Sequence, residues 1–243
     1  YNGTSYTSTN IGSGNNGIFT ATIPARSVTA DTNFSFYWNF ILGTSSINSK
    51  QNNQTITNFG IDDCSVYTNM IYNFTIRDEE TRVAFPYING TFHVDLWLST
   101  MGTENRVISY SNLFNSTSNK YICTNLNFSS YRVDMVGEYV ATGYVNEFYF
   151  IDNGTLYDSS PTATIDLHDL LLTDSTTFLF QFTDESTATV PNAVVLVYRN
   201  YIGEGIFREV ERAKTDNNGE TQLRLVEEDV IYYFVVTLDG QTI

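Results

Sequence analysis

In several segments of this 243-residue chain, large apolar side chains occupy every second position. The apolar members of the clearest runs are Phe34, Phe36, Trp38 and Phe40; Phe92, Val94, Leu96 and Leu98; Phe178, Phe180 and Phe182; and Tyr232, Phe234, Val236 and Leu238. Because successive side chains of a β-strand point to opposite faces, these runs predict half-buried strands of antiparallel sheets. A helical period is absent from every window of eleven or more residues, and a short helix or turn is expected only around residues 165–172. The fold class is therefore all-β, with two antiparallel β-sandwich domains (Ig-like or jelly-roll-like) in tandem.

Charge divides the chain unevenly. Residues 1–153 carry 12 acidic and 7 basic side chains among many Asn, Ser and Thr, whereas residues 154–243 carry 15 acidic and 5 basic ones. The stretch Asp158–Thr162 reads as a linker at that change. The predicted parts are a flexible or strand-donating arm over 1–18, a first sandwich over 19–157 and a C-terminal Ig-like sandwich over 163–243.

A net charge of −15 argues against nucleic acid as a partner, since nucleic-acid binding needs a basic surface. The longest apolar runs, such as Ile231–Val236, span six residues, whereas a membrane helix needs about 20. We therefore expect no membrane span within this chain. Asp239-Gly240 after an apolar run predicts a hairpin turn into a further strand. We expect the natural chain to continue there, and an anchor beyond Ile243 is compatible with this prediction.

The pattern Asn-X-Ser/Thr, the acceptor for N-linked glycans, occurs eight times and only in the first 155 residues. The eight asparagines are Asn2, Asn33, Asn53, Asn73, Asn89, Asn115, Asn127 and Asn153. Asn73 alternates with Tyr72 and Phe74, which places it on the solvated face of its strand. The sequence predicts N-linked glycans, and the alternative is an Asn/Ser/Thr-rich surface without sugar.

Cys64 and Cys123 are the two cysteines, in a chain with only three lysines. An even cysteine count together with many acceptor sites is typical of an oxidising compartment, so we expect a disulfide between them. The alternative is two separate buried thiols. With His93 and His168 far apart in sequence, the spacing of a metal site is missing, and no metal or other cofactor is expected.

The last seventy residues follow a recognisable order. Val190-Pro191-Asn192-Ala193 leads into an apolar strand, and Thr215-Asp216-Asn217-Asn218-Gly219-Glu220-Thr221 leads into the final strands. This order resembles small Ig-like modules of the transthyretin or carboxypeptidase-regulatory type, in which a P-x-A-x-V strand precedes a T-D-x-x-G-x-T turn. The resemblance covers about 65 residues and implies a compact Ig-like sandwich.

Within that motif, Asp216, Asn218 and Gly219 are expected to be structural turn residues, because Asp and Asn bond turn amides and Gly adopts a positive φ. A calcium loop is the alternative, but the long acidic spacing of an EF-hand is missing. Some bacterial relatives of these modules crosslink a strand Lys to an Asn. The strand Thr177–Thr183 has no Lys, so we expect no such bond.

The whole chain is also loosely similar to predicted surface proteins of uncultivated archaea and their viruses. The similarity lies in the acceptor-rich region around Asp62-Asp63-Cys64-Ser65-Val66-Tyr67, followed by Tyr-Arg-Asn-Tyr (198–201) and Lys-Thr-Asp (214–216).

A catalytic motif is missing. His93 and Asp95 lie two residues apart on the polar face of one strand, without a nucleophile signature nearby. We interpret them as a solvated face, and His168 as part of a linker turn. Asp78-Glu79-Glu80 and Glu227-Glu228-Asp229 are predicted to be charged hairpin turns.

These observations favour an extracellular, glycosylated structural protein at a cell or virion surface, without enzymatic activity. It is expected to form or decorate a pilus-like filament, surface layer or virion spike, with copies of itself or other surface proteins as partners. The first alternative is an adhesin or carbohydrate-binding module, with or without calcium, that uses exposed aromatic residues such as Tyr37 and Trp97. The second is a hydrolase with an unrecognised pair of carboxylates.

Overall fold

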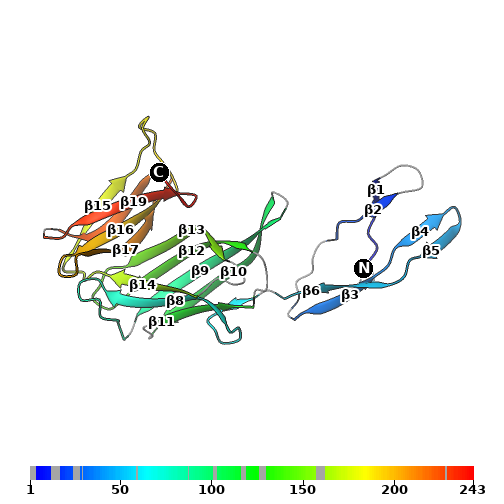
Figure 1. Cartoon of the computed structure of the whole chain (residues 1–243), viewed down its shortest axis with the longest axis horizontal. Coiled ribbons are helices and arrows are strands. Elements are labelled where there is room, and N and C mark those ends of the chain that lie inside the picture. The colour runs from blue at the N-terminus through cyan, green and yellow to red at the C-terminus, as the bar shows by residue number, and fades with distance from the viewer. Residues whose placement is uncertain are drawn as a thin grey trace. The chain divides into compact units, whose positions relative to one another are not determined.

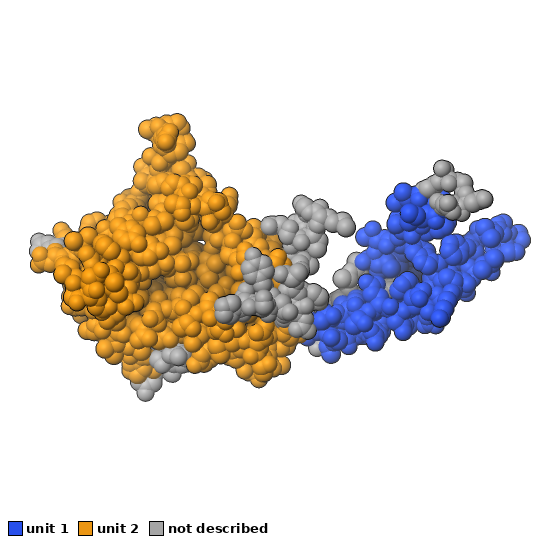
Figure 2. Space-filling view, in the orientation of Figure 1, with its two compact units in different colours: residues 1–58 blue, residues 59–243 orange. Residues whose placement is uncertain are grey.

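The computed structural model describes residues 4–11, 17–23, 28, 30–58, 60–86, 88–100, 103–115, 119–125, 130–156, 162–227 and 229–243, without the side chains of 98–100, 103–107 and 119. The chain forms two compact units, residues 1–58 and 59–243 (Figure 2). Strands and turns make up the described residues (Figure 1), which confirms the all-β prediction. Within these residues, no helix is long and apolar enough to cross a membrane.

The first unit consists of three two-stranded antiparallel sheets, β1-β2, β3-β6 and β4-β5. Their strands are β1 (Thr9–Ile11), β2 (Ile18–Thr20), β3 (Thr32–Phe36), β4 (Asn39–Leu42), β5 (Ser45–Asn48) and β6 (Asn52–Ile56). The last four form one long hairpin. Between its two ladders, the Ser49 amide donates to the Trp38 carbonyl oxygen and the Trp38 amide donates to the Ser49 hydroxyl. The side chains at 34, 36, 38 and 40 are partly buried and those at 33, 35, 37 and 39 are exposed, as the alternation predicts.

The second unit contains a four-stranded sheet, β14-β8-β11-β7, and an eight-stranded sheet, β10-β9-β12-β13-β17-β16-β19-β20. A third sheet pairs β15 with β18. The strands are β7 (Ile61–Asp62), β8 (Asn69–Asp78), β9 (Asn89–Thr100), β10 (Thr103–Asn115), β11 (Asn119–Thr124), β12 (Tyr131–Val140), β13 (Glu147–Leu156), β14 (Ala163–Asp169), β15 (Ser175–Gln181), β16 (Val194–Tyr201), β17 (Ile206–Lys214), β18 (Glu220–Val226), β19 (Tyr232–Leu238) and β20 (Gln241–Thr242).

The first hydrophobic core lies between the four-stranded sheet and strands β9, β12 and β13 of the long sheet (Figure 1). The rings of Phe74 on β8 and Phe92 on β9 contact each other across the two sheets, with centroids 4.4 Å apart. The fully enclosed side chains of this core include Phe74, Ile76, Phe92, Val94, Leu96, Val133 and Tyr139. The predicted inward faces of β8 and β9 are thus the observed ones, and the side chain of Leu98 lies outside the described residues.

The second hydrophobic core lies between β16, β17 and β19 on one side and the β15-β18 pair on the other. Val197 and Leu223 are fully buried there, and Phe180 contacts Phe234 at 5.0 Å between centroids. Phe178 and Phe234, expected to face inward, remain 36 % and 38 % exposed. A two-stranded sheet is too narrow to cover every apolar side chain of the sheet that faces it.

The two cores share one sheet, because β13 of the first pairs with β17 of the second. That pairing is parallel and only one residue pair long, Tyr149 with Arg212. The junction is therefore weak in backbone hydrogen bonds, and side chains must hold it.

The segment around residues 165–172 is not the predicted helix or turn. Residues Ala163–Asp169 form strand β14, which pairs in parallel with β8 over seven residues. Ile165 and Leu167 point to the first core while Thr164 and Asp166 are exposed, so the segment has period two. The period-two pattern covers only a few residues and the parallel partner β8 is far away in sequence, so this strand was not predicted from the sequence.

The structural division also differs from the predicted parts. The structure separates the chain between residues 58 and 59, and β13 and β17 join the two predicted sandwiches within one unit. Residues 157–161, most of the predicted linker, lie outside the described residues. The predicted arm contains β1, which pairs with β2 of the same chain. The predicted turn at Asp239-Gly240 does lead into a further strand, β20.

Candidate functional site

Four acidic side chains are buried where the two cores of the second unit meet. Glu79 follows β8, Glu147 begins β13, Asp169 ends β14 and Glu211 lies on β17, and none is more than 5 % exposed. We call these four residues the carboxyl cluster. Burial of so many acidic groups is unusual, since a charge leaving water needs a paired charge or several hydrogen bonds.

Glu79 is the member with a cationic partner. Its carboxylate accepts a hydrogen bond from Arg199 on β16 at 2.9 Å and another from the Tyr232 hydroxyl on β19 at 3.0 Å. The Tyr201 hydroxyl donates to the Glu79 carbonyl oxygen at 2.6 Å, and the Glu79 amide donates to the Asp169 carbonyl oxygen at 2.9 Å. The turn after β8 is therefore attached to the second core. Asp78-Glu79-Glu80 lies in a hairpin turn, as predicted, and within it the Glu79 side chain is buried.

For the other three carboxyl groups, the described residues show no ion pair like that between Glu79 and Arg199. Burial raises the pKa of Glu147 well above its ordinary value, and the charges of Glu211, Asp169 and Glu79 raise it further. Burial likewise raises the pKa of Glu211 to about 8, opposed by a hydrogen bond from the Arg224 amide. At neutral pH Glu211 therefore holds its proton in the folded protein.

Asp169 completes the cluster beside the first core. One of its carboxyl oxygens accepts a hydrogen bond from the Ala141 amide at 2.7 Å, and the other has no hydrogen-bond partner among the described residues. Burial raises its pKa to about 8. Burial also lowers the pKa of neighbouring His168 to about 4, so this imidazole is neutral at pH 7. The His168 carbonyl oxygen accepts a hydrogen bond from the buried Tyr139 hydroxyl at 2.8 Å, so His168 lies in a core strand and not in the predicted linker turn.

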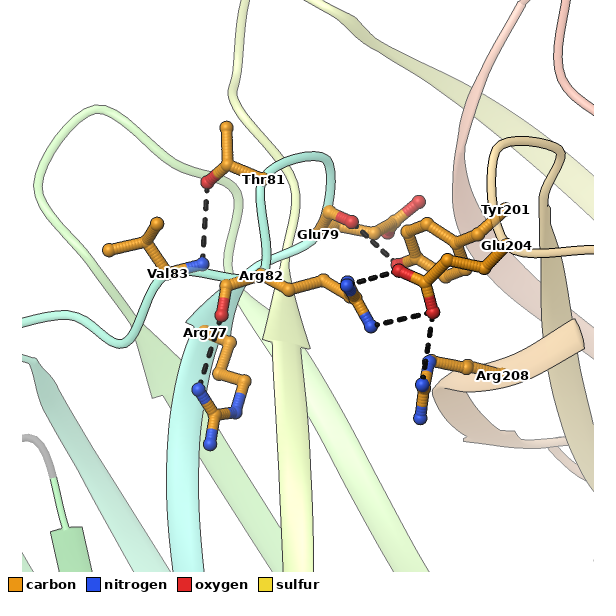
Figure 3. A network of polar contacts seen from close by, with 8 residues as sticks. All are labelled: Arg77, Glu79, Thr81, Arg82, Val83, Tyr201, Glu204 and Arg208. Atoms are coloured by element: carbon orange, nitrogen blue, oxygen red, sulfur yellow. Dashed lines mark hydrogen bonds and ion pairs between the residues drawn. The ribbon is translucent and has the colours of Figure 1, made fainter. Parts of the chain in front are cut away.

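A network of polar contacts at the surface lies beside Glu79 (Figure 3). Arg82 contacts both carboxylate oxygens of Glu204, and Arg208 donates to the same carboxylate at 3.1 Å. The Arg82 guanidinium also lies 5.3 Å from the centre of the Tyr201 ring. This network connects the turn after β8 with the turn between β16 and β17.

A shallow pocket of about 330 Å³ lies beside this network. The turn after β8, the end of β16 and residues 229–230 line it. Arg82 and Arg199 line the pocket but already bind Glu204 and Glu79, which leaves them poorly disposed toward a ligand anion. The contacts of Glu79, Arg82, Arg199 and Glu204 therefore join the first core to the second.

The predicted disulfide between Cys64 and Cys123 is present, with Cα atoms 4.8 Å apart. Pairing of β7 with β11 places Asp62 opposite Cys123, which brings the two cysteines together. The Asp62 carboxylate then accepts hydrogen bonds from the amides of Cys64, Val66 and Tyr67 and so fixes the loop after β7. The bond closes a loop with a sequence separation of 59 residues.

Replacement of both cysteines, Cys64→Ser with Cys123→Ser, is expected to lower the free energy of unfolding by about 2–4 kcal/mol. The reason is that the unfolded chain loses its long closed loop. Urea denaturation of the oxidised protein and the double variant measures the difference. Equal midpoints for the two proteins would contradict this expectation.

Six of the eight predicted glycan acceptors lie in the described residues; Asn2 and Asn127 lie outside them. Asn33 and Asn53 are exposed on one face of the β3-β6 ladder and form a reciprocal pair. The Ser35 hydroxyl donates to the Asn53 side-chain oxygen at 2.8 Å, and the Thr55 hydroxyl donates to that of Asn33 at 2.6 Å. Each acceptor sequence thus supplies its hydroxyl to the other, and both hydrogen bonds use side-chain oxygens, not the nitrogens that carry sugar.

Asn89 and Asn115 form a second pair, since they lie directly opposite each other at one end of the β9-β10 ladder and both are exposed. The remaining two described acceptors are Asn73, which is partly exposed, and Asn153, which is exposed. Asn73 lies on the face of β8 opposite Tyr72 and Phe74, as the alternation predicts, but it is only partly exposed and its side-chain oxygen is buried. Asn153 has a φ of 54° and donates its side-chain amide to the Asp239 carbonyl oxygen at 2.8 Å.

Asp216, Asn218 and Gly219 lie in a tight turn between β17 and β18. The Asp216 carboxylate accepts hydrogen bonds from the amides of Asn218 and Glu220 at 2.8 and 2.9 Å, and these bonds lower its pKa. Gly219 has a φ of 72°, and a Cβ there would lie 2.7 Å from the Phe182 carbonyl oxygen. These contacts give all three residues a structural role. In the described residues, no group of three or more His, Cys, Asp or Glu is arranged to hold a metal ion.

His93 and Asp95 lie on the outer face of the long sheet, with the imidazole nitrogen 3.5 Å from the Asp95 carboxylate. Ser111 is opposite His93 on β10, but no hydrogen bond links their side chains among the described contacts. On the same face, the Arg132 guanidinium covers the Trp97 ring at 4.7 Å from its centre. Trp97 therefore has one ring face occupied, which weakens it as a sugar-stacking residue.

The carboxyl cluster itself was missed at the level of sequence. Glu79 stands in a run of three acids that resembles an exposed turn, and Glu147 and Glu211 stand in strands whose covered face depends on the junction of two sheets. One signal was present in the sequence. Asp169 follows Ile165 and Leu167 at every second position, so it lies on the same inward side of the strand, which indicates a buried carboxyl group.

A search of protein-family models gives no match, and curated proteins give none either. Among solved structures the chain is similar to the Bacillus anthracis TIE protein, with a TM-score of 0.26 and 16 % identity over 87 % of this chain and 39 % of that one. It is also similar to a streptococcal ancillary pilin, with a TM-score of 0.23 and 12 % identity over 98 % of this chain and 79 % of that one. The chain thus spans about two fifths of the first protein. TM-scores this low show neither a shared fold nor a shared function.

Proposed function

We propose that this protein is an extracellular structural protein, N-glycosylated and disulfide-bonded, that forms or decorates a surface assembly. The observation that carries the proposal is the disulfide between Cys64 and Cys123. Disulfides persist in oxidising compartments and are rare where glutathione keeps thiols reduced.

The display of glycan acceptors supports the same proposal. Asn33, Asn53, Asn89, Asn115 and Asn153 are exposed. Asn89 and Asn115 are partners across β9 and β10, and Asn33 and Asn53 lie on the neighbouring strands β3 and β6. Glycans at Asn89 and Asn115 would shield the end of β10, which is an edge strand of the long sheet. Shielding of an edge prevents unplanned pairing with other chains.

The chemistry of the buried acids supports a structural role over catalysis. The carboxyl cluster lies at a junction between two cores, with each member at most 5 % exposed, so a substrate has no direct access to it. The resemblance of residues 176–240 to transthyretin or carboxypeptidase-regulatory modules remains a prediction, supported by the succession of β15 to β19 around the second core. The loose similarity to archaeal and viral surface proteins also remains a prediction.

Intact mass of the native protein, before and after reduction and enzymatic deglycosylation, tests this proposal. We expect a gain of two mass units on reduction and a loss of sugar mass on deglycosylation. Asn33, Asn53, Asn89 and Asn115 are expected to be occupied first, because the side-chain nitrogen of Asn153, although this residue is exposed too, donates to the Asp239 carbonyl oxygen. Electron microscopy of native surfaces labelled with an antibody against this chain then reports its location. Free thiols with bare asparagines, or label confined to the cell interior, would remove the proposal.

A further inference from the structure

The first unit has no core of its own. None of its described residues is buried, although it contains many large apolar side chains. A two-stranded ribbon in water is at best marginally stable, and it becomes stable when its apolar face is covered. The unit therefore needs a surface to pack against.

The long hairpin Thr32–Ile56 shows which of its faces needs cover. Its polar face carries Asn33, Ser35, Asn53 and Thr55 on one ladder, and Asn39, Ser46 and Asn48, joined by hydrogen bonds of 2.6 Å, on the other. The same face also carries the exposed side chains of Tyr37 and Ile41. Its other face, which we call the apolar face, carries Phe34, Phe36, Phe40, Leu42, Ile47 and Ile56, with Thr32, Ser45, Asn52 and Gln54 opposite some of them. Leu42 and Ile47 are 63 % and 55 % exposed there, while Phe40 is contacted by Phe19 of β2 at 5.4 Å between ring centroids.

Charge indicates what can cover that face. Residues 1–58 contain one acidic and two basic side chains, whereas residues 59–243 contain 26 acidic and 10 basic ones. Two copies of the chain repel each other wherever their second units approach. The hairpin of the first unit is nearly uncharged, so two hairpins approach each other without that repulsion.

We propose that the apolar face of the Thr32–Ile56 hairpin binds the same face of a second copy of this chain. Two ribbons packed face to face, about 10 Å apart, form a small sandwich whose core the two copies share. Such a contact is self-complementary, as a two-fold interface requires. The proposal rests on the proposed function, because glycans at Asn33 and Asn53 keep the opposite face in water.

Sedimentation velocity of the full glycosylated chain tests this contact with single substitutions. Ile47→Asp and Leu42→Asp each place a charge on the apolar face at a position already more than half exposed, so the isolated chain tolerates them. Ile41→Asp is the matched control, because Ile41 is 75 % exposed and pairs with Ser46 on the polar face.

We expect the wild type and Ile41→Asp to dimerise equally, and Ile47→Asp and Leu42→Asp to weaken the dimer at least about 100-fold, because each dimer then buries two like charges. A wild type that stays monomeric at about 100 μM would overturn the inference. So would a dimer that the apolar-face variants and the control affect alike. In either case, a chain that still carries its disulfide and glycans keeps the proposed function, whereas free thiols and bare asparagines remove that function whatever the dimer does.

Discussion

The protein is expected to unfold at a lower temperature at pH 8.5 than at pH 5, with a free energy of unfolding lower by at least about 3 kcal/mol. The cause is the carboxyl cluster. The pKa values of Glu211 and Asp169 are raised to about 8, and that of Glu147 is raised as well, because burial disfavours their charged forms. Each pH unit between the unfolded and folded pKa of one group costs about 1.4 kcal/mol.

The direction follows from where each group holds its proton. Below about pH 4 these carboxyls are protonated in both states, so they do not disfavour folding. Between about pH 4 and pH 8 the unfolded chain releases their protons first, and stability falls as pH rises. His168 acts in the opposite sense, because its pKa is lowered to about 4 and the unfolded chain takes up its proton first below about pH 6.5. Because one imidazole opposes several carboxyl groups, the free energy of unfolding falls less steeply with pH but still falls.

Thermal unfolding of wild type, Glu147→Gln and Glu211→Gln between pH 5 and pH 8.5 measures this effect. Each substitution removes a buried carboxyl at nearly constant shape, so we expect higher stability than wild type at pH 8.5 and a smaller dependence on pH. Glu138→Gln is the control, since Glu138 is exposed on β12 and its removal is expected to change stability by less than about 0.5 kcal/mol. Stability that stays constant or rises from pH 5 to pH 8.5 in the wild type would refute the assignment.

Arg199→Met is expected to lower the free energy of unfolding by about 3–5 kcal/mol at pH 7, because it leaves the Glu79 carboxylate buried without its cation. Arg199 is 9 % exposed and its guanidinium lies 2.9 Å from Glu79. The same substitution removes one of the links between the turn after β8 and the second core, and those from Tyr201 and Tyr232 to Glu79 remain. Urea denaturation at pH 7 measures the loss.

Two further variants test whether the unpaired Glu79 carboxylate causes the destabilisation by Arg199→Met. Glu79→Gln added to Arg199→Met is expected to recover part of the loss, since a neutral amide needs no cation and still accepts the hydrogen bond from Tyr232. Arg208→Met removes an exposed partner of Glu204 and is expected to cost about 1 kcal/mol or less. If Arg199→Met and Arg208→Met destabilise equally, the buried pair does not hold the junction.

Local patterns predicted much of the fold. Alternating apolar residues located β3, β4, β9, β15 and β19, because neighbouring residues of a strand point to opposite faces. The turn at Asp239-Gly240 was also readable, since its conformation depends on residues next to each other. Of the site, the sequence indicated the disulfide and the acceptor asparagines, but not which acceptors are exposed.

The sequence by itself determined that this chain forms strands, where most of them lie and which of their sides are apolar, because backbone sterics and side-chain alternation act over a few residues. Only the tertiary structure decided that β14 pairs with β8, that one sheet passes through two cores, and that Glu79, Glu147, Asp169 and Glu211 lie buried together. Those outcomes depend on which distant segments exclude water from one another. No short window of residues contains that information, because the free energy of burying a charge is set by whatever packs around it.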